Sequence, residues 1–461
     1  MNYSWNLNEI PILQLGSEFY DPAEPAPFPL MKLRYLNPNI PISFPEERLW
    51  DFKPLSSNMP NALALRYHGH QFQHYNPHLG DGRGFLYAQF KHNKQWYDLG
   101  TKGSGQTKYS RSGDGRLTLK GAVREALATE MLYSKGVQTS QTLCFFETGE
   151  NLTRGDEPSP TRSAVLTRFS LGHIRFGTFQ RLAFLKEVEN IKKLTSYCLN
   201  FYYSEQAQQL NFKDETFVAS AFLDLVCQRN AQLAAEVMLA GFVHGVLNTD
   251  NMNISGELFD YGPYRFLPQY DPQFTAAYFD QQGLYAYGRQ PTTFLWNLQQ
   301  LAFALEVAFP ELISSEILER FNGYFNEALQ KYFLKRLNLR CDNPELITDT
   351  ISLFYQLMKE KDLYFEQTFF DFHSFDLDHI QKSEVSVKYS GPVFEKLKLN
   401  FSKMTCSEIE KKKNPYFKKV KPETLLIDEL ESIWSAIENS DDWSLFEKKL
   451  QSIRELQIIY R

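Results

Sequence analysis

A polar segment between residues 244 and 262 carries the side chains best suited to metal binding in this 461-residue chain. Asp250 and Asn251 stand together in it, and Asp260 follows nine residues after the asparagine. Hard divalent cations such as Mg²⁺ prefer carboxylate and amide oxygens as ligands. Strand-like sequence flanks the polar residues, so we expect Asn251 and Asp260 on adjacent strands, close enough to share one ion.

The spacing in this segment matches the catalytic loop of protein kinases, His-Arg-Asp-x-x-x-x-Asn, in which Asn follows His by seven residues. His244 and Asn251 have that separation, and the Asp260-Tyr261-Gly262 triplet resembles the kinase metal-binding Asp-Phe-Gly. Val246 occupies the place of the usual kinase base, which leaves Asp250 as the only carboxylate in the loop. Two motifs in the right order favour a nucleotide site over an ordinary hairpin.

Two glycine-rich stretches precede this segment in the chain. Gly80-Asp81-Gly82-Arg83 lies just before a predicted strand, and a second Gly-Asp-Gly-Arg occupies residues 113–116. Glycine lets a backbone approach phosphate closely, and arginine offers a forked donor to phosphate oxygens. One such stretch is most often an ordinary turn; two around one pair of strands leave phosphate binding and simple turns equally open.

Charged residues between these stretches could hold phosphates. Lys102 closes a predicted strand, and Glu125 lies 23 residues later on the inward side of a predicted helix. Kinase-like folds aim a strand lysine at phosphates by pairing it with a helix glutamate; the alternative is two unrelated surface residues. Arg168 and Arg175 lie among apolar and aromatic neighbours in the sequence. They could be a pair that binds phosphate, or surface arginines whose aliphatic stems cover aromatic rings.

The elements that must position these residues change character along the chain. Residues 20–60 are rich in proline and predict an extended wrap, and residues 84–102 predict two strands joined by a tight turn. Residues 119–136 have the apolar spacing of a helix that ends at Gly136, and residues 137–170 read as strands. Further helices are expected over residues 216–242, 293–309, 312–336, 344–360 and 442–457.

This order of elements predicts an α+β, bilobal, protein-kinase-like fold. Residues 1–177 would form the N-terminal wrap and a smaller strand-rich nucleotide-binding lobe. Residues 178–461 would form a larger, mainly helical lobe that carries the loop at 244–262. The cleft between the lobes would hold the ligand.

Composition excludes several classes of protein. The net charge of −6 gives no basic footprint for general nucleic-acid binding. No run of about 18 apolar residues predicts a membrane span, and the N-terminus has no signal-like region, so a cytoplasmic protein is expected. Five scattered cysteines without a Cys-x-x-Cys pair read as reduced core thiols: Cys144, Cys198, Cys227, Cys341 and Cys406.

Two further motifs are open to competing interpretations. Four histidines between His68 and His78 suggest a metal site, but their spacing and Pro77 favour a structural role under the glycine loop. The lysine-rich stretch 411–421 is most simply a solvated basic segment, with a patch for an acidic partner as the alternative.

Taken together, these motifs resemble the selenoprotein O family, whose bacterial members are protein adenylyltransferases with a kinase fold. The similarity spans about residues 65–290 and fades through the C-terminal third. It is carried by HGHQFQHYNPHLGDGRG, LGTKGSGQTKYSRSGDGR, REALATE, TRFSLGHIRFG, HGVLNTDNM and DYGPY. The resemblance implies ATP bound in a flipped orientation, so that AMP and not phosphate is transferred.

The resemblance also implies a role for each matching residue. Residues that line the nucleotide site would be Gly80, Gly82 and Arg83. Residues that hold the phosphates would be Lys102, Asp114, Gly115, Arg168 and Arg175, with Glu125 orienting the lysine. Asp250 would accept the proton, and Asn251 with Asp260 would bind Mg²⁺ or Mn²⁺, Asp260 also contacting the nucleotide.

The expected activity is transfer of AMP from ATP to Ser, Thr or Tyr hydroxyls of proteins, with UTP as a possible second donor. Arg83, Arg168 and Arg175 make a cationic end for the terminal phosphate, which would leave the α-phosphate near the metal. An ordinary phosphotransferase and a nucleotide-binding pseudokinase remain the alternatives. Many relatives end in a redox-active Cys or selenocysteine pair, and some have a Cys in the segment after the DYGP motif. This chain ends in Tyr460-Arg461 and has no Cys in QFTAAYFD, so redox control by that route is not expected.

Overall fold

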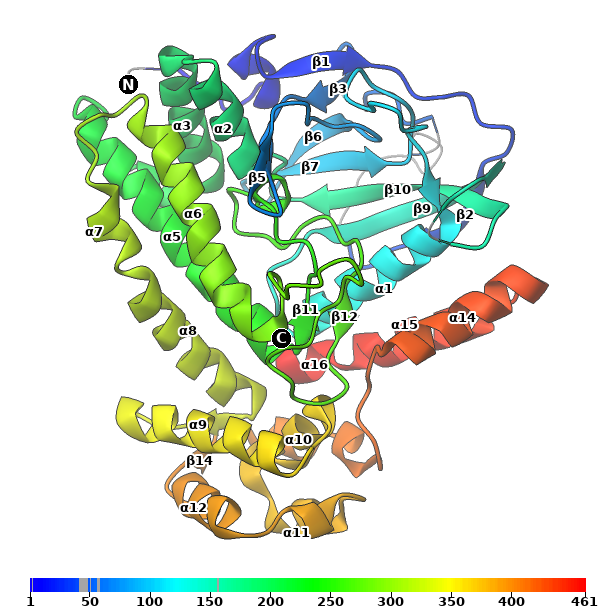
Figure 1. The fold of residues 1–461 in the computed structure, drawn as a ribbon, viewed down its shortest axis with the longest axis vertical. Helices are drawn as coiled ribbons and strands as arrows, with labels where there is room; N and C mark the ends of the chain where they lie inside the picture. Colours follow the sequence, from blue (N-terminus) through cyan, green and yellow to red (C-terminus); the bar gives the residue numbers. More distant parts are fainter. Residues whose placement is uncertain (2, 41–48, 50, 56–58, 156) are drawn as a thin grey trace.

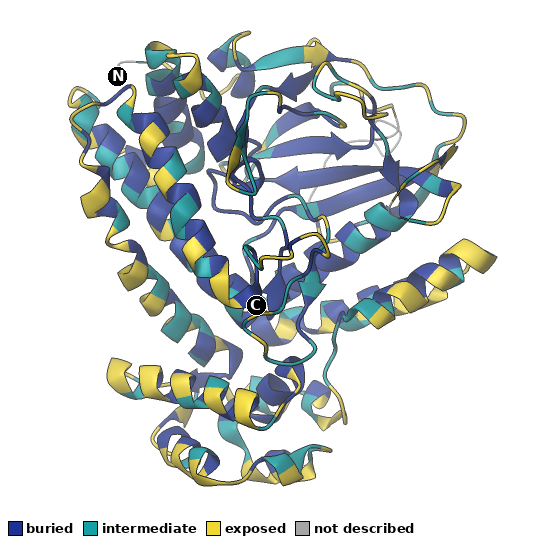
Figure 2. Cartoon of the chain, viewed as in Figure 1, coloured by how far each residue is buried: buried dark blue, intermediate teal, exposed yellow. Residues whose placement is uncertain are grey.

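The computed structural model describes residues 1, 3–40, 49, 51–55, 59–155 and 157–461. It has a mixed α/β architecture in which one large antiparallel sheet packs against helices, with further helices beyond it (Figure 1). The predicted α+β character is therefore confirmed. The central strands are mostly buried, whereas the outer helices α9 (Pro344–Glu360), α12 (Pro392–Phe401) and α14 (Ile427–Ser440) carry exposed faces (Figure 2).

The large sheet has eight strands. Its order is β1 (Tyr20–Ala23), β3 (Ala62–Leu65), β6 (Leu86–His92), β7 (Gln95–Lys102), β10 (Thr161–Ser170), β9 (Gln141–Leu152) and β2 (Lys32–Leu36), with β8 (Leu117–Thr118) paired to β10. The predicted hairpin at 84–102 is confirmed as β6 and β7. Its two-residue turn, Asn93-Lys94, has positive φ at both positions, as a tight hairpin turn requires.

Helix α1 (Leu119–Ser134) lies against β9 and β10 and carries Glu125 into the protein interior. The side chain of Thr118 caps its first turn by accepting the backbone N–H of Gly121, and the left-handed Gly136 follows its end, as predicted. Chain from the far end of the sequence packs on the same helix: α14, α15 (Ser444–Glu455) and α16 (Gln457–Tyr460) (Figure 1). Helix α1 is thus held between the sheet and the C-terminal helices.

Helices dominate after residue 175. They are α2 (Phe176–Phe184), α3 (Val188–Tyr202), α4 (Ser204–Ala207), α5 (Glu215–Leu239), α6 (Gln290–Glu306), α7 (Ser314–Leu318), α8 (Phe321–Arg336), α9, α10 (Phe365–Asp371), α11 (Leu377–Lys382), α12 and α13 (Ile409–Lys412). The helices predicted at 216–242, 293–309 and 344–360 correspond to α5, α6 and α9. The predicted segment 312–336 is two helices, because the chain turns at Glu319-Arg320 between α7 and α8.

The polar segment at 244–262 differs from its prediction in one respect. Strand β11 (Phe242–Val243) precedes it, but its partner is β12 (Arg265–Phe266), which comes after the Asp260 triplet. Asp260 is therefore not on a strand, and the expectation of two adjacent metal-binding strands is wrong. Leu258, two residues earlier, forms isolated β-bridges in extended backbone. At Asp260 the φ is 60°, in the left-handed region, so the extended conformation ends there.

The proline-rich segment 20–60 supplies β1 and β2, which lie at opposite edges of the sheet. Part of that predicted wrap, residues 41–48, 50 and 56–58, lies outside the described residues. Three cysteines are buried core thiols as predicted, but Cys341 and Cys406 are partly exposed, because they lie at the short strand pair β13 (Leu339–Arg340) and β14 (Thr405–Cys406). None of the described helices is both long and apolar enough to cross a membrane.

Candidate active site

A cavity of about 630 Å³ opens beside the ends of β7 and β10. It brings together residues from sequence positions as far apart as 67 and 260. Ten of the residues singled out from the sequence line it: Gly80, Gly82, Arg83, Lys102, Asp114, Gly115, Arg168, Arg175, Asp250 and Asp260. Of the remaining two, Glu125 lies behind the wall in contact with Lys102, and Asn251 follows Asp250 in the short 3-10 turn η3 (Thr249–Asn251).

The two glycine-rich stretches pack against each other at one side of this cavity. Thr107 and Ser110 donate their hydroxyls to the backbone carbonyls of Asp81 and Gly82. A Cβ on Gly80 would lie 2.4 Å from the Tyr109 ring, so glycine is required there by the neighbouring loop itself. Packing of the two loops thus explains why glycine occurs here, in addition to the close approach to phosphate that the sequence suggested.

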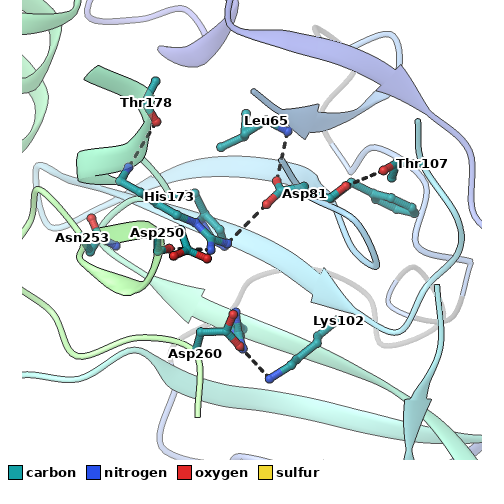
Figure 3. Close-up of polar contacts among 12 residues, drawn as sticks. Leu65, Asp81, Lys102, Thr107, His173, Thr178, Asp250, Asn253 and Asp260 are labelled. Carbon is teal, nitrogen blue, oxygen red and sulfur yellow. Dashed lines mark hydrogen bonds and ion pairs between the residues drawn. The ribbon is translucent and has the colours of Figure 1, made fainter. Parts of the chain in front are cut away.

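Four charged side chains form a closed network at the base of the cavity. Lys102 Nζ lies 2.6 Å from Glu125 Oε2 and 2.7 Å from Asp260 Oδ1, a contact drawn in Figure 3. Arg168 contacts the same two carboxylates, through Nε to Glu125 at 2.6 Å and through Nη2 to Asp260 at 2.7 Å. Arg168 therefore lies in the same network as Lys102 and Glu125, which the sequence paired without it.

The charges in this network control its protonation. Burial would raise the pKa values of Asp260 and Glu125, but the nearby cations Lys102 and Arg168 outweigh burial and hold both pKa values below the ordinary range. Both carboxyls are therefore ionised at neutral pH. Burial lowers the pKa of Lys102, and its two carboxylate partners oppose that change.

Arg175 links the glycine loop to the loop that carries Asp250. Its guanidinium lies between the rings of Tyr67 and Phe259, with centroid distances of 4.5 and 4.7 Å. Nη1 donates to the backbone oxygen of Asp250 at 2.8 Å, and Nη2 donates to Asp81 Oδ1 at 3.3 Å. Its Nε is buried and takes part in no hydrogen bond with the described residues. One donor of this arginine is thus left for a ligand.

Asp250 has one carboxylate oxygen in use and one without a partner. Oδ2 accepts from Gln71 Nε2 at 3.3 Å, whereas Oδ1 is buried and accepts no hydrogen bond from the described part of the chain. Burial raises the pKa of Asp250 to about 6, although the charge of Arg175 opposes the shift. A buried carboxylate oxygen without a donor retains its capacity to accept a hydroxyl proton or to bind a cation.

The oxygens near Asp250 suit a hard divalent ion. Asn251 donates its amide N–H to the carbonyl of Val246 at 2.9 Å, so its Oδ1 faces away from that bond and is unused among the described residues. Asp260 is bound through Oδ1, which leaves Oδ2. Carboxylate and amide oxygens are the ligands that Mg²⁺ and Mn²⁺ prefer, and such ions keep water or phosphate oxygens as well. The donor set therefore fits the predicted metal.

The four histidines do not make a metal site. No group of three or more His, Cys, Asp or Glu side chains in the described ranges is arranged to hold an ion. Gly69–Asn76 forms the hairpin β4 (Gly69–Gln71) and β5 (His74–Asn76), which packs on η3 and α2. The structural interpretation is therefore favoured, but the bond from this motif goes from His70 to Thr249, beside Asp250, and not to the glycine loop.

His244 is a structural member of the loop. It is fully buried, and its Nε2 lies 3.0 Å from the carbonyl of Phe259, directly before Asp260. The backbone N–H of Val246 donates to its Nδ1 at 3.4 Å. Burial lowers the pKa of His244, so the ring is neutral at neutral pH and joins the two halves of the polar segment through both nitrogens.

Basic residues outnumber acidic ones around the cavity. The basic residues are Arg83, Lys102, Arg111, Arg116, Arg154, Arg168 and Arg175, and the acidic ones are Asp81, Asp114, Asp250 and Asp260. Arg83 and Arg111 are exposed, and their side chains form no hydrogen bond or ion pair with the described residues. Asp114 pairs with Arg154 at 2.8 Å. The excess of positive charge suits a polyphosphate.

Several residues of the site were not assigned from the sequence. Asp81, Arg154 and the aromatic pair Tyr67 and Phe259 belong to this group. Asp81 stands inside a glycine motif, so its position was visible. Its partner Arg175 is 94 residues away, and neither periodicity nor spacing indicates a contact over that distance.

One buried acid beneath the site gives a test of stability against pH. Glu257 Oε2 accepts from the backbone N–H of Leu171 at 2.8 Å and from the Ser255 hydroxyl at 3.0 Å, and burial raises its pKa to about 7. A raised folded-state pKa stabilises the fold at low pH, and this contribution is lost as pH rises from about 4.5 through about 7. Glu257→Gln retains an acceptor for both bonds without the charge.

We expect Glu257→Gln to unfold at higher urea than the wild type at pH 8 and with little difference at pH 5. Between pH 5 and pH 8, the difference in free energy of unfolding between the variant and the wild type should change by about 3 kcal/mol. Urea unfolding at four pH values between 5 and 8 measures it. A difference that stays constant with pH would show that Glu257 is not the titrating group.

Comparison with known proteins gives consistent matches over nearly the whole chain. The family model described as protein adenylyltransferase SelO matches residues 5–454. A protein nucleotidyltransferase YdiU of Trichodesmium erythraeum is 41% identical over 97% of this chain and 98% of its own length. Those of Synechocystis and Trichormus variabilis are 40% and 39% identical, covering 97% of this chain and 98% and 96% of their own lengths.

Proposed function

The chain belongs to the protein adenylyltransferase SelO family and is a nucleotidyltransferase, and from this premise we propose that it transfers AMP from ATP to protein Ser, Thr or Tyr hydroxyls. The observation that carries the proposal is the buried Oδ1 of Asp250, without a partner among the described residues, in a cavity rich in Lys and Arg. A polyphosphate needs the cations, and an incoming hydroxyl needs a proton acceptor.

The proposed reaction is a single displacement at the α-phosphorus of ATP. The acceptor oxygen forms a bond to that phosphorus, the bond to the oxygen bridging to the β-phosphorus breaks, and pyrophosphate leaves. The hydroxyl proton moves to Asp250 Oδ1. A pKa of about 6 keeps this carboxyl mostly ionised at neutral pH and makes it a stronger base than an ordinary aspartate.

The cations of the cavity orient the nucleotide in this proposal. Lys102 and Arg168 bind the phosphates at the base, and Arg83 and Arg175 bind the terminal phosphate from the glycine-loop side. Binding there places the α-phosphate toward Asp250. A Mg²⁺ or Mn²⁺ ion held by Asn251 and Asp260 would neutralise phosphate oxygens when bound. Positioning and neutralisation of charge supply most of the catalysis in such transfers.

We also propose a kinase-like, bilobal organisation, with the division near residue 177. The support is the order of parts: a lysine at the end of β7, a glutamate on α1, then the loop with Asp250 and the Asp260 triplet. The proposed division falls within α2, so that helix would belong to the junction. A cytoplasmic location is part of the same proposal.

The position of the label in ATP distinguishes ordinary phosphate transfer from the proposed transfer of AMP. We expect label from the α-position to appear on protein in the presence of Mg²⁺ or Mn²⁺, and label from the γ-position to stay off it. The measurement is gel autoradiography of the purified chain incubated with a cell extract as acceptor, with EDTA as the control. Protein carrying γ-label without α-label means phosphotransfer, and protein carrying neither supports a pseudokinase. UTP labelled at the α-position tests the second donor in the same assay.

A further inference from the structure

The hairpin β4–β5 contacts the Asp250 loop through residues 69–72. We propose that this hairpin is a positioning element for Asp250, in which Gln71 determines that Oδ1 and not Oδ2 faces the acceptor hydroxyl. The inference rests on the proposed function of Asp250. It adds the residue that fixes the carboxylate and assigns a role to the histidine-rich motif.

Three consecutive hairpin residues hold three consecutive loop residues. The bonds run from the His70 N–H to Thr249 Oγ1 at 2.7 Å, from Gln71 Nε2 to Asp250 Oδ2 at 3.3 Å, and from the Phe72 N–H to Asn248 Oδ1 at 3.1 Å. Two of the three donors are backbone groups, whose positions are fixed by the hairpin itself. The loop therefore follows the hairpin as one unit.

The amide of Gln71 is held in one orientation. Asn76, across the hairpin, donates its side-chain N–H to Gln71 Oε1 at 3.2 Å. The Gln71 NH₂ group must therefore face Asp250, where it occupies Oδ2. Gly69 completes the close fit, because a Cβ there would lie 3.0 Å from the Asp250 Cβ. The remaining oxygen, Oδ1, is the one without a partner among the described residues.

The tip of the hairpin is strained, and the loop compensates for the strain. Phe72 and Gln73 form its two-residue turn with φ values of 49° and 65°, a conformation in which Asn-Gly is usual. Each such residue costs about 1–2 kcal/mol. The Phe72 ring packs on Tyr285 at 4.9 Å, and the Tyr285 hydroxyl donates to Asn248 Oδ1 at 2.6 Å. Strained turns that the surroundings hold in place are typical of functional sites.

The histidine motif supports the same contact from behind. Gln180 on α2 donates to His70 Nδ1 at 2.8 Å and accepts the Thr249 hydroxyl through Oε1 at 2.6 Å. One glutamine side chain thus joins the hairpin to the loop at the residue before Asp250. The His70 ring lies against Trp296 of α6, with centroids 5.4 Å apart. The hairpin is consequently anchored to α2 and α6, and the Gln71 side chain donates to the Asp250 carboxylate.

Loss of the Gln71 donor should slow the chemical step and leave the nucleotide site intact. Without it, Asp250 Oδ2 has no partner and the carboxylate can rotate, so either oxygen or neither faces the hydroxyl. Misplacement of a catalytic group by about 1 Å costs up to about 100-fold in rate. None of the cations proposed to bind phosphate hydrogen-bonds to Gln71 among the described residues.

The test compares Gln71→Ala and Gln71→Glu with His74→Ala. His74 pairs with Gln71 across the hairpin, is exposed, and makes no side-chain hydrogen bond with the described residues, so it is the matched control. Initial rates of α-label transfer to the extract proteins are measured over a range of ATP concentrations. We expect the maximal rate to fall about 10- to 100-fold in Gln71→Ala, with the half-saturating ATP concentration within about two-fold of wild type.

Gln71→Glu keeps the length and the acceptor for Asn76 but replaces the donor with a like charge, so we expect at least as large a loss. Melting temperatures within about 2 °C of wild type would exclude unfolding as the cause in either variant. His74→Ala should transfer label at the wild-type rate. If both Gln71 variants match wild type while Asp250→Asn is inactive, the positioning role is wrong and the proposed function stands. If the wild type itself transfers no α-label, the proposed function fails first.

Discussion

Asp250→Asn is expected to lose transfer of α-labelled nucleotide by about 10²- to 10⁴-fold, the usual contribution of a positioned general base. The substitution is nearly isosteric. An asparagine can still accept the Gln71 N–H through its oxygen, and Arg175 binds the backbone of residue 250, which does not change. Its NH₂ would stand at the place of Oδ1 and cannot take a proton.

The affinity for ATP should not fall together with the transfer rate in this variant. The cations proposed to bind phosphate make no side-chain contact to Asp250, so ATP affinity measured by calorimetry should stay within about three-fold of wild type. Asp378→Asn, an exposed position on α11, serves as the control and should be fully active. Substantial transfer by Asp250→Asn would remove this residue from the mechanism.

Lys102→Met should weaken ATP binding by at least 10-fold and destabilise the fold as well. The lysine is 4% exposed and touches two carboxylates, Glu125 at 2.6 Å and Asp260 at 2.7 Å. Its removal takes away a phosphate contact and leaves Arg168 as the only cation bonded to the buried Glu125 and to Asp260, whose side chain is 25% exposed, among the described residues. Breaking a buried ion pair by removing one partner costs about 3–5 kcal/mol, because the other charge stays buried.

Calorimetric titration with ATP and urea unfolding measure the two effects separately. Lys120→Met is the matched control: Lys120 lies on α1 and pairs with the partly exposed Glu431 at 2.7 Å. A surface pair of this kind contributes about 0–1 kcal/mol, so the control should bind ATP normally and lose little stability. Unchanged ATP affinity in Lys102→Met would contradict a phosphate role for this lysine.

Local patterns predicted the elements that hold the site. The hairpin β6–β7 and helix α1 follow from alternation, turn residues and helical spacing within short windows, and each window contains its own signal. Helix α14 was also visible in principle. Leu430, Ile433, Trp434 and Ile437 have helical spacing and are buried together, but no helix was assigned there.

Contacts over long sequence distances were predicted only in part. Lys102 and Glu125 were paired because a known pattern joins a strand lysine to a helix glutamate. Nothing in the sequence indicated that Arg168 binds the same glutamate, or that Asp260 closes the network from 158 residues beyond Lys102. Asp260 was placed on a strand because its neighbours are apolar. Its left-handed φ instead turns its carboxylate toward the cations, which only the tertiary contacts determine.

The strand order of the large sheet determines how long an edge strand waits for its partner while the chain is synthesised on the ribosome. Both edge strands, β1 and β2, come from the first 36 residues, yet β2 pairs with β9, which begins at residue 141. On the order of 100 residues must be added before this partner exists, which takes about 5–20 s at usual translation rates. During that interval the nascent segment has an unpaired strand, and it is open to chaperones or to misplaced pairing with a neighbouring chain.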